Sequence, residues 1–385
     1  MPHSPRTGSA IKRPRVPRVP PFTLILAALT LTVAWPQVGS AKLQSDQKTP
    51  PKIDHSAGGI FNSGLPKTEK TESSESSTAK AEFDKTQTDP ALSHSTRLTY
   101  TDPIISRWKA GVRLTGGAAD SYNIYITLPV PNDWPEQSVS VVQEDIPIKA
   151  QVVTYRILDN GLKQMLIKLP NLPARETLEL TTTFRVVTCQ IDGPSVTDDL
   201  VRPDSDDRSL NDYLGGSPSI TFNDRKLKDK LTEIVQEKSN LWEEIQAIYD
   251  WVRDEIEQRE MANIDSLKAF KQGYGSEEDK ISLFIAFCRA HRVPARVVWV
   301  DGSSYAEFCL ADDAGNLQWF PANVAGLREF GCYSEPRVIL QKGDNIKVPE
   351  KSQRQRFVAE YVSAKGRSGA AKPTVEFIRE LLPND

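Results

Sequence analysis

The sequence predicts an α+β protein in which a small all-β sandwich domain precedes a domain with a central buried helix packed on an antiparallel sheet. Three observations carry this expectation. Apolar and polar residues alternate within 96–190, as on half-buried strands. Helical stripes of apolar residues begin at Leu227. A later helix is apolar nearly all round and is followed by short apolar segments, so it belongs in a core rather than on a surface.

The first 95 residues are expected to lie outside both domains. Residues 1–41 contain five basic and no acidic residues, an apolar run from Phe22 to Trp35, and small residues at 39–41. These are the three parts of a signal peptide, which predicts export to the periplasm, cell envelope or exterior. An uncleaved membrane anchor is the alternative. Residues 42–95 have the polar, charged composition of a disordered linker.

Charge and cysteine usage exclude several classes of protein. The formal net charge of −3 becomes −8 once the basic leader is removed, which argues against a nucleic-acid partner. No other segment is apolar and long enough to cross a membrane, so membrane contact is expected only if the leader stays uncleaved. The cysteines are too few and irregular for a disulfide scaffold, although a Cys309–Cys332 bridge stays open. No ligand cluster of metal spacing occurs, and no cofactor is expected.

The first domain, residues 96–190, is expected to consist of strands joined by proline-rich turns. Asn160-Gly161 has the form of a two-residue hairpin turn between two of the strands. A polar connector over 191–222 follows, rich in Asp, Ser and Pro. The expected strand segments are Tyr122–Leu128, Val153–Ile157, Lys163–Leu169 and Leu178–Val186.

The second domain, residues 223–335, is expected to begin with two amphipathic helices. The buried central helix then starts at Ser276, which forms a capping box with Asp279, and it ends before Pro294. Residues 336–385 form a C-terminal extension with a final short helix near Val375 to Leu382. The segments expected as strands after the central helix are Ala295–Val300, Ala306–Leu310 and Gln318–Phe320.

Several of these segments resemble the transglutaminase-like superfamily of papain-type folds. Arg289-Ala290 followed by Pro294-Ala295-Arg296 matches the segment that leads from the central helix into the first strand of that family. Residues 248–256 are similar to the helix before the family's nucleophile motif. The tail, with Gln-Lys-Gly-Asp-Asn at 341–345, resembles an exported bacterial subgroup. The resemblance spans about residues 100–380, and it implies a papain-like fold with a cysteine–histidine site.

The same resemblance places the catalytic positions on residues that cannot perform this chemistry. The family motif Gly-x-Cys-x-Asp aligns with Gly275 and Asp279, which puts the nucleophile position on Glu277. The position of the histidine base falls on Ser303, and that of the orienting residue on Asn323. Thiol catalysis needs a thiolate and an imidazole, so two of the three roles are vacant. The residues expected to line the cleft are Ser276, Tyr305, Glu307 and Trp319.

Other residues offer no replacement for the missing groups. Ser276 is explained as a helix cap, and Glu277 as a first-turn carboxylate favoured by the helix dipole. Cys288 lies in the apolar middle of the helix, where a thiol behaves as a small hydrophobe. His291 is expected at the C-terminal end of the same helix, where the dipole favours it.

The leading hypothesis is therefore a catalytically inactive transglutaminase-like protein whose cleft binds a peptide, a polyamine or an envelope component. The first alternative is an amide hydrolase or acyltransferase with altered chemistry, which uses Glu277 with Ser303 or Asn323. The second is a structural or interaction protein with a filled cleft.

Overall fold

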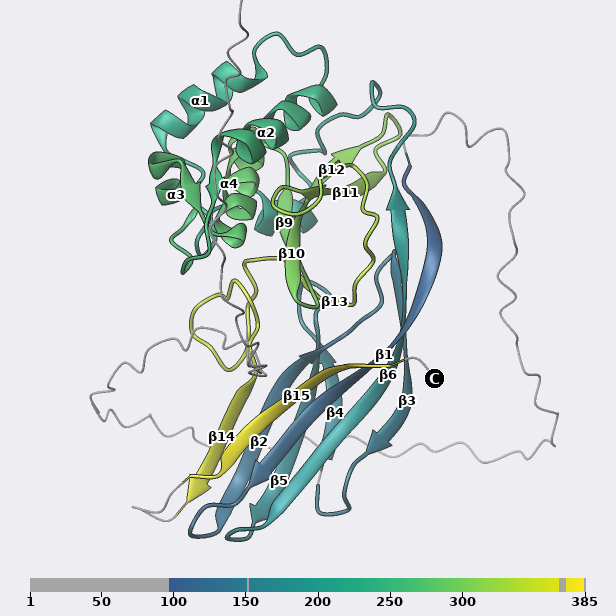
Figure 1. Cartoon of the computed structure of the whole chain (residues 1–385), viewed down its shortest axis with the longest axis vertical. Helices are drawn as coiled ribbons and strands as arrows, with labels where there is room; N and C mark the ends of the chain where they lie inside the picture. Colours follow the sequence, from purple (N-terminus) through teal and green to yellow (C-terminus); the bar gives the residue numbers. More distant parts are fainter. Residues whose placement is uncertain (1–96, 151, 367–371, 384–385) are drawn as a thin grey trace, which may run out of the picture. The chain divides into compact units, whose positions relative to one another are not determined.

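The computed structural model describes residues 97–150, 152–366 and 372–383, so the expected signal peptide and linker lie outside the described residues. The described chain contains a β sandwich and a mixed helix-and-sheet domain, as the sequence predicts (Figure 1). Within these residues, no helix has the length and apolarity needed to cross a membrane.

The sandwich consists of two four-stranded antiparallel sheets. Their strand orders are β15-β1-β6-β3 and β14-β2-β5-β4. Alternate side chains of the two sheets meet in one apolar core that includes Trp108, Ile126, Ile167 and Phe184. This arrangement confirms the all-β expectation. The strands from this part of the chain are β1 (Thr99–Thr115), β2 (Ser121–Val130), β3 (Gln137–Asp145), β4 (Val152–Ile157), β5 (Lys163–Leu172) and β6 (Thr177–Asp192).

The C-terminal residues complete this sandwich as edge strands, namely β14 (Tyr361–Gly366) and β15 (Thr374–Leu382). The helix expected near Val375 to Leu382 is therefore wrong. β15 pairs with β1 over nine residues, and Val375 and Phe377 pack against the sandwich core. The open edge of β1 thus overrides the local helical preference, as tertiary contacts commonly do.

The α-helices of the mixed domain pack on one face of a five-stranded sheet (Figure 1), and the short helix η2 packs on the other face against Cys309 and Trp319. The central helix α4 is buried from Asp279 to Arg289, as its apolar composition predicts. The guanidinium of Arg289 is fully buried in an ion pair with Asp344 at 2.8 Å. The helical elements are η2 (Arg208–Tyr213), α1 (Arg225–Val235), α2 (Leu241–Glu255), α3 (Ser266–Gln272) and α4 (Glu277–Ala290).

The five-stranded sheet is antiparallel throughout, with the order β12-β11-β10-β9-β13. Ala306, Phe308 and Leu310 of β10 lie in the core cluster that contains α4. Tyr305 lies on the alternate face and clusters with Ile191 at the end of β6. The strands are β9 (Ala295–Val300), β10 (Ser303–Ala311), β11 (Leu317–Asn323), β12 (Glu329–Phe330) and β13 (Ile339–Lys342), besides a short parallel pair of β7 (Glu257–Gln258) and β8 (Tyr274–Gly275).

Hydrogen bonds join the sandwich to this sheet. The backbone of Ile191 exchanges two hydrogen bonds with that of Tyr333, at 2.8 and 2.9 Å. The buried side chain of Gln137 donates to the carbonyl of Ile339 and accepts from its N–H. The two parts are therefore connected by satisfied buried polar groups as well as by apolar contacts.

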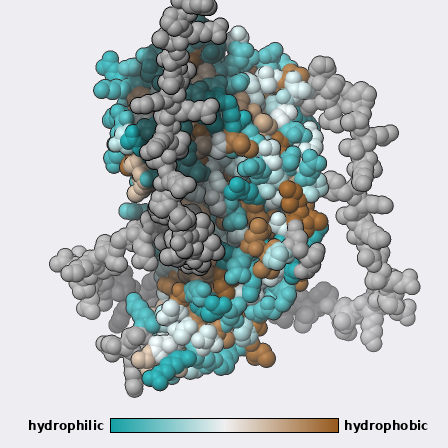
Figure 2. All heavy atoms as spheres, in the orientation of Figure 1, coloured by the Kyte–Doolittle hydropathy of each residue, from teal (hydrophilic) through white to brown (hydrophobic). Residues whose placement is uncertain are grey.

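The surface mixes polar and apolar residues, and the face in Figure 2 shows separate brown areas among teal ones. Scattered exposed apolar side chains are normal for folded proteins and do not by themselves define a docking site. Those more than 45% exposed on the sandwich include Ile105, Val141, Val142, Ile148 and Ile157.

Candidate functional site

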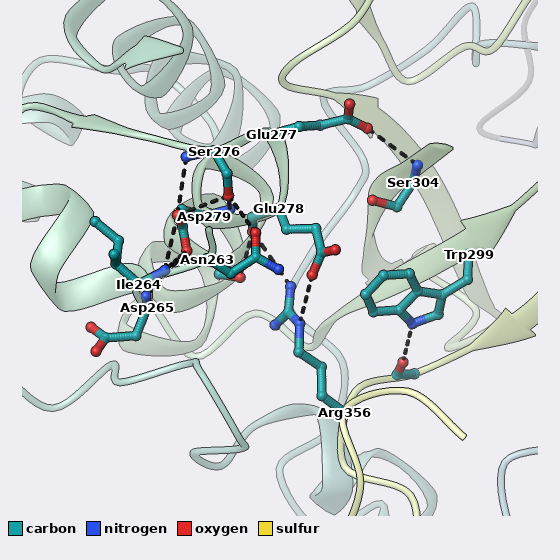
Figure 3. Close-up of polar contacts among 12 residues, drawn as sticks. Asn263, Ile264, Asp265, Ser276, Glu277, Glu278, Asp279, Trp299, Ser304 and Arg356 are labelled. Carbon is teal, nitrogen blue, oxygen red and sulfur yellow. Dashed lines mark hydrogen bonds and ion pairs between the residues drawn. The ribbon is translucent and has the colours of Figure 1, made fainter. Parts of the chain in front are cut away.

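The N-terminus of α4 is held by a dense set of hydrogen bonds around Asp279. Ser276 and Asp279 form the predicted capping box, in which each side chain accepts from the backbone N–H of the other residue. The carboxylate of Asp279 also accepts from the N–H groups of Ile264 and Asp265 (Figure 3). Gly275 fits tightly here, since a Cβ at that residue would lie 2.8 Å from Cβ of Asp279. The position of the first helical residue, Glu277, is thereby fixed.

The structure brings Glu277 and Ser303, the expected nucleophile and base positions, into hydrogen-bond contact. The Ser303 hydroxyl donates to Oε1 of Glu277 at 2.9 Å. The backbone N–H of Ser304 donates to the same oxygen at 3.3 Å (Figure 3). Two donors and a helix N-terminus are an arrangement that binds negative charge. The carboxylate of Glu277 is therefore held in place by these donors at the junction of α4 and β10.

Asn323, at the third predicted position, is engaged in the turn that follows β11. Its Oδ1 accepts from the N–H of Gly326 at 2.9 Å, and its Nδ2 donates to Glu329 at 3.5 Å. Its carbonyl accepts from the hydroxyl of Tyr249 and from Arg253. These contacts stabilise the turn. They also engage the side-chain amide of Asn323 with Gly326 and Glu329 and not with Ser303.

Tyr333 packs against Tyr305, one of the residues expected to line the cleft. Its ring stacks on that of Tyr305, with the centroids 4.3 Å apart. Burial raises the pKa of Tyr333 to about 12, with further contributions from Glu329, Glu335 and Glu277. The phenol is therefore neutral near pH 7. It lies outside any periodic apolar pattern, so the sequence gives no signal for it.

Arg356 is a second residue that sequence reasoning missed. It reaches from the segment before β14 to Glu278, with Nε 3.4 Å from Oε2 and Nη2 3.4 Å from the carbonyl oxygen (Figure 3). Its guanidinium lies 5.4 Å from the centroid of the Trp299 ring, which Phe357 also contacts. The Trp299 indole N–H in turn donates to the carbonyl of Gly343. The C-terminal segment therefore packs beside the carboxylates at the start of α4.

Among the described residues, the side-chain hydrogen bonds of Glu277 go to Ser303 and Ser304 and to no thiol or imidazole group. All four cysteines are free, so the Cys309–Cys332 bridge does not form. Cys288 is fully buried in α4, and this burial raises its pKa well above the ordinary range. His291 caps the opposite end of α4, where its Nε2 lies 2.6 Å from Glu244 and 2.7 Å from Arg202. Burial lowers the pKa of His291.

The four predicted cleft residues separate into two groups. Ser276 adjoins Glu277 but is nearly buried and engaged in the cap. Tyr305 is buried beneath Tyr333. Glu307 and Trp319 belong to a different charged region, where the guanidinium of Arg296 stacks 3.9 Å from the Trp319 ring and donates to Glu307. The structure thus places only Ser276 directly beside Glu277.

Glu307 is part of a group that we call the buried ion cluster, made up of Glu136, Arg296, Glu307 and Lys342. Lys342 bonds both carboxylates, and its Nζ lies 2.6 Å from Glu307. Arg296 Nη2 lies 2.7 Å from Glu307. Burial alone would raise the pKa of Glu307, but Lys342 and Arg296 lower it. The cluster joins the sandwich, which supplies Glu136, to three strands of the five-stranded sheet.

Comparison with known proteins identifies the mixed domain. Residues 226–324 match the model of the transglutaminase-like superfamily. A solved protein of Cytophaga hutchinsonii, titled as a candidate cysteine protease, is 16% identical over 75% of this chain and 94% of that one, with a TM-score of 0.47. A candidate protease of Parabacteroides distasonis is 13% identical over 57% and 43% of the two chains, with a TM-score of 0.24. No curated protein matches the chain.

Proposed function

With residues 226–324 identified as a transglutaminase-like domain, we propose that this protein is catalytically inactive and that it binds a ligand at the N-terminus of α4. The ligand is a peptide, a polyamine or another amine-bearing envelope component. We also propose that the protein is exported, because residues 1–41 have the composition of a signal peptide.

The observation that carries this proposal is the hydrogen bond from Ser303 to Glu277, at 2.9 Å. A papain-type reaction needs a thiolate and an imidazole at hydrogen-bond distance, so that the imidazole accepts the proton of the thiol. Here a hydroxyl donates to a carboxylate. Neither group is a strong nucleophile paired with a base, so the geometry supports recognition rather than acyl transfer.

The same geometry favours an amine as the group that is recognised. Both donors bond to Oε1 of Glu277, and the side chain is only partly buried. A carboxylate held in place by its own neighbours loses little conformational freedom when it binds an ammonium group. The charge-assisted hydrogen bond between an ammonium group and a carboxylate is also among the stronger ones.

The test is to titrate the exported chain, starting at Lys42, with spermidine and with a lysine-containing peptide in a calorimeter. Glu277→Gln keeps the size of the side chain and removes its charge, so we expect at least tenfold weaker binding. Glu260→Gln, at an exposed glutamate on the surface, is the matched control and should bind like the wild type. Equal affinities of the two variants would remove Glu277 from the binding site. No binding by the wild type would favour a purely structural role.

One observation favours an altered enzyme as the second candidate. The contact between Ser303 and Glu277 also has the geometry of a hydroxyl beside a general base. The wild type and Glu277→Gln should therefore be incubated with a peptide pool and an amine donor, and the products examined by mass spectrometry. Amide hydrolysis or cross-linking by the wild type alone would replace the non-catalytic proposal with this one.

A further inference from the structure

The buried ion cluster borders a cavity of about 110 Å³ between the sandwich and the transglutaminase-like domain. Tyr100 and Glu136 contribute to its wall from the sandwich. Arg296, Glu307, Trp319 and Lys342 contribute from the other domain. The cavity is separate from the Glu277 site, because none of its lining residues takes part in the hydrogen bonds described there.

The walls of this cavity carry two positive and two negative side chains. All four are at least 92% buried, with exposed fractions of 5% for Glu136, 8% for Arg296, 2% for Glu307 and 2% for Lys342. Lys342 bridges the two carboxylates, while Arg296 bonds to Glu307 alone. The formal charges sum to zero. A buried cluster of this kind is stable only while it stays neutral and paired.

Neutrality restricts the charge of any ligand. An anion or a cation alone would compete with the paired charges of the four buried side chains and leave one of them uncompensated, which is unfavourable. A molecule that carries both an ammonium and a carboxylate group adds no net charge. Its ammonium can approach Glu136 or Glu307, and its carboxylate can approach Arg296 or Lys342.

The volume restricts the size of the ligand. A cavity of about 150 Å³ holds a molecule the size of benzene, so a cavity of about 110 Å³ holds a somewhat smaller one. That is far less than a drug-sized pocket. It suits a molecule of a few heavy atoms, and the apolar part of the wall is formed by Leu98, Pro135, Ile191, Leu317 and Trp319.

We infer that this cavity binds a small zwitterionic amino acid of the size of glycine or alanine. The ligand would contact Tyr100 and Glu136 on one side and Arg296 and Glu307 on the other. Its binding therefore stabilises the contact between the two domains, independently of what binds at Glu277.

The test is calorimetric titration of the wild-type chain with glycine, L-alanine and L-leucine, and with acetate and methylammonium at matched ionic strength. We expect saturable binding of glycine or alanine, and at least tenfold weaker binding of leucine and of the two singly charged ions. Saturable binding of acetate or methylammonium at the same affinity would overturn the charge argument. No binding of glycine or alanine would overturn the inference.

A pair of tryptophan variants localises the binding. Leu317 is 41% exposed and lines the cavity, so Leu317→Trp should fill it and abolish binding without loss of the fold. Leu327 is 50% exposed and does not line the cavity, so Leu327→Trp should bind like the wild type. Amino acids also stabilise proteins by exclusion from their surface, which would raise the unfolding temperatures of both variants equally. Equal affinities of the two variants for glycine or alanine, measured by the same titration, would contradict a site in this cavity.

Discussion

At the scale of single residues, the candidate site depends on Asp279 more than on any group that faces a ligand. Its carboxylate is 1% exposed and accepts hydrogen bonds from Ser276, Ile264 and Asp265. The loop before α3 and the start of α4 are therefore tied to one side chain. A shift of this carboxylate would displace Glu277 from Ser303 without any change to either residue.

Asp279→Ala should lower the free energy of unfolding by about 2–4 kcal/mol, because three backbone donors lose a buried acceptor. Urea denaturation followed by circular dichroism measures this change. Asp313→Ala, at an exposed residue of the β10–β11 turn, should change stability by less than about 0.5 kcal/mol. Comparable losses in the two variants would show that the Asp279 contacts contribute little.

His291 gives the molecule a stability that depends on pH. Burial lowers its pKa in the folded protein, with Glu244 and Arg202 as the charged neighbours that face it. The unfolded chain binds a proton near the ordinary value of 6.5, and the folded chain only at lower pH. The stabilising contribution of the neutral imidazole is therefore complete above pH 6.5 and is lost as the pH falls towards the folded pKa.

The measurement is the free energy of unfolding between pH 8 and pH 5. We expect a decrease below about pH 6.5 with a slope under about 1.4 kcal/mol per pH unit, the limit for one proton. His291→Gln should flatten the curve in this window. Paired carboxylates with lowered pKa, such as that of Glu307, lose their contribution only at more acidic pH. An unchanged slope in the variant would assign the pH dependence to other groups.

At the scale of the secondary-structure elements, the sandwich depends on a strand from the far end of the chain. β15 covers the edge of β1, and Phe377 packs against the sandwich core while Leu381 on the same strand is 54% exposed. An uncovered β1 would present unpaired backbone groups to other chains. The sandwich is therefore completed only when the C-terminal residues have been added.

Phe377→Ala should cost about 1–3 kcal/mol, less than a fully buried phenylalanine because this ring is only partly buried. Leu381→Ala removes an apolar side chain from the same strand and should cost less than about 0.5 kcal/mol. Thermal and urea unfolding of both variants would measure the difference. Equal effects would argue against the pairing of β15 that places Phe377 on the core.

The elements that the sequence predicts correctly are those with strong local signals. The capping box and the all-round apolar composition of α4 predict both its start and its burial, and both predictions are confirmed. Glu277 and Ser303, which the resemblance gives as the nucleophile and base positions, lie in hydrogen-bond contact. β15 escaped prediction because its strand conformation depends on β1, more than 250 residues earlier. The contacts of Tyr333 with Tyr305 and of Arg356 with Glu278 arise from long-range packing, which leaves no local pattern.

At the scale of the whole molecule, the buried ion cluster links the sandwich to the transglutaminase-like domain through ion pairs. Glu136 lies between β2 and β3, and its carboxylate bonds to Lys342 of β13. Glu307 also bonds to Arg296 and would stay paired without Lys342. Glu136 would lose its ion-pair partner. The two carboxylates therefore depend on Lys342 to different extents.

Lys342→Met should therefore destabilise the protein by about 3–5 kcal/mol, since breaking a buried ion pair leaves an uncompensated charge. Adding Glu136→Gln removes that charge, and the double variant should recover most of the loss. Glu136→Gln alone should cost less than Lys342→Met, because Lys342 keeps Glu307 as a partner. Urea unfolding of the wild type and the three variants forms a double-mutant cycle. Additive losses in the double variant would show that the two residues do not interact, and the link between the domains would then rest on the apolar and backbone contacts around Ile191 and Tyr333.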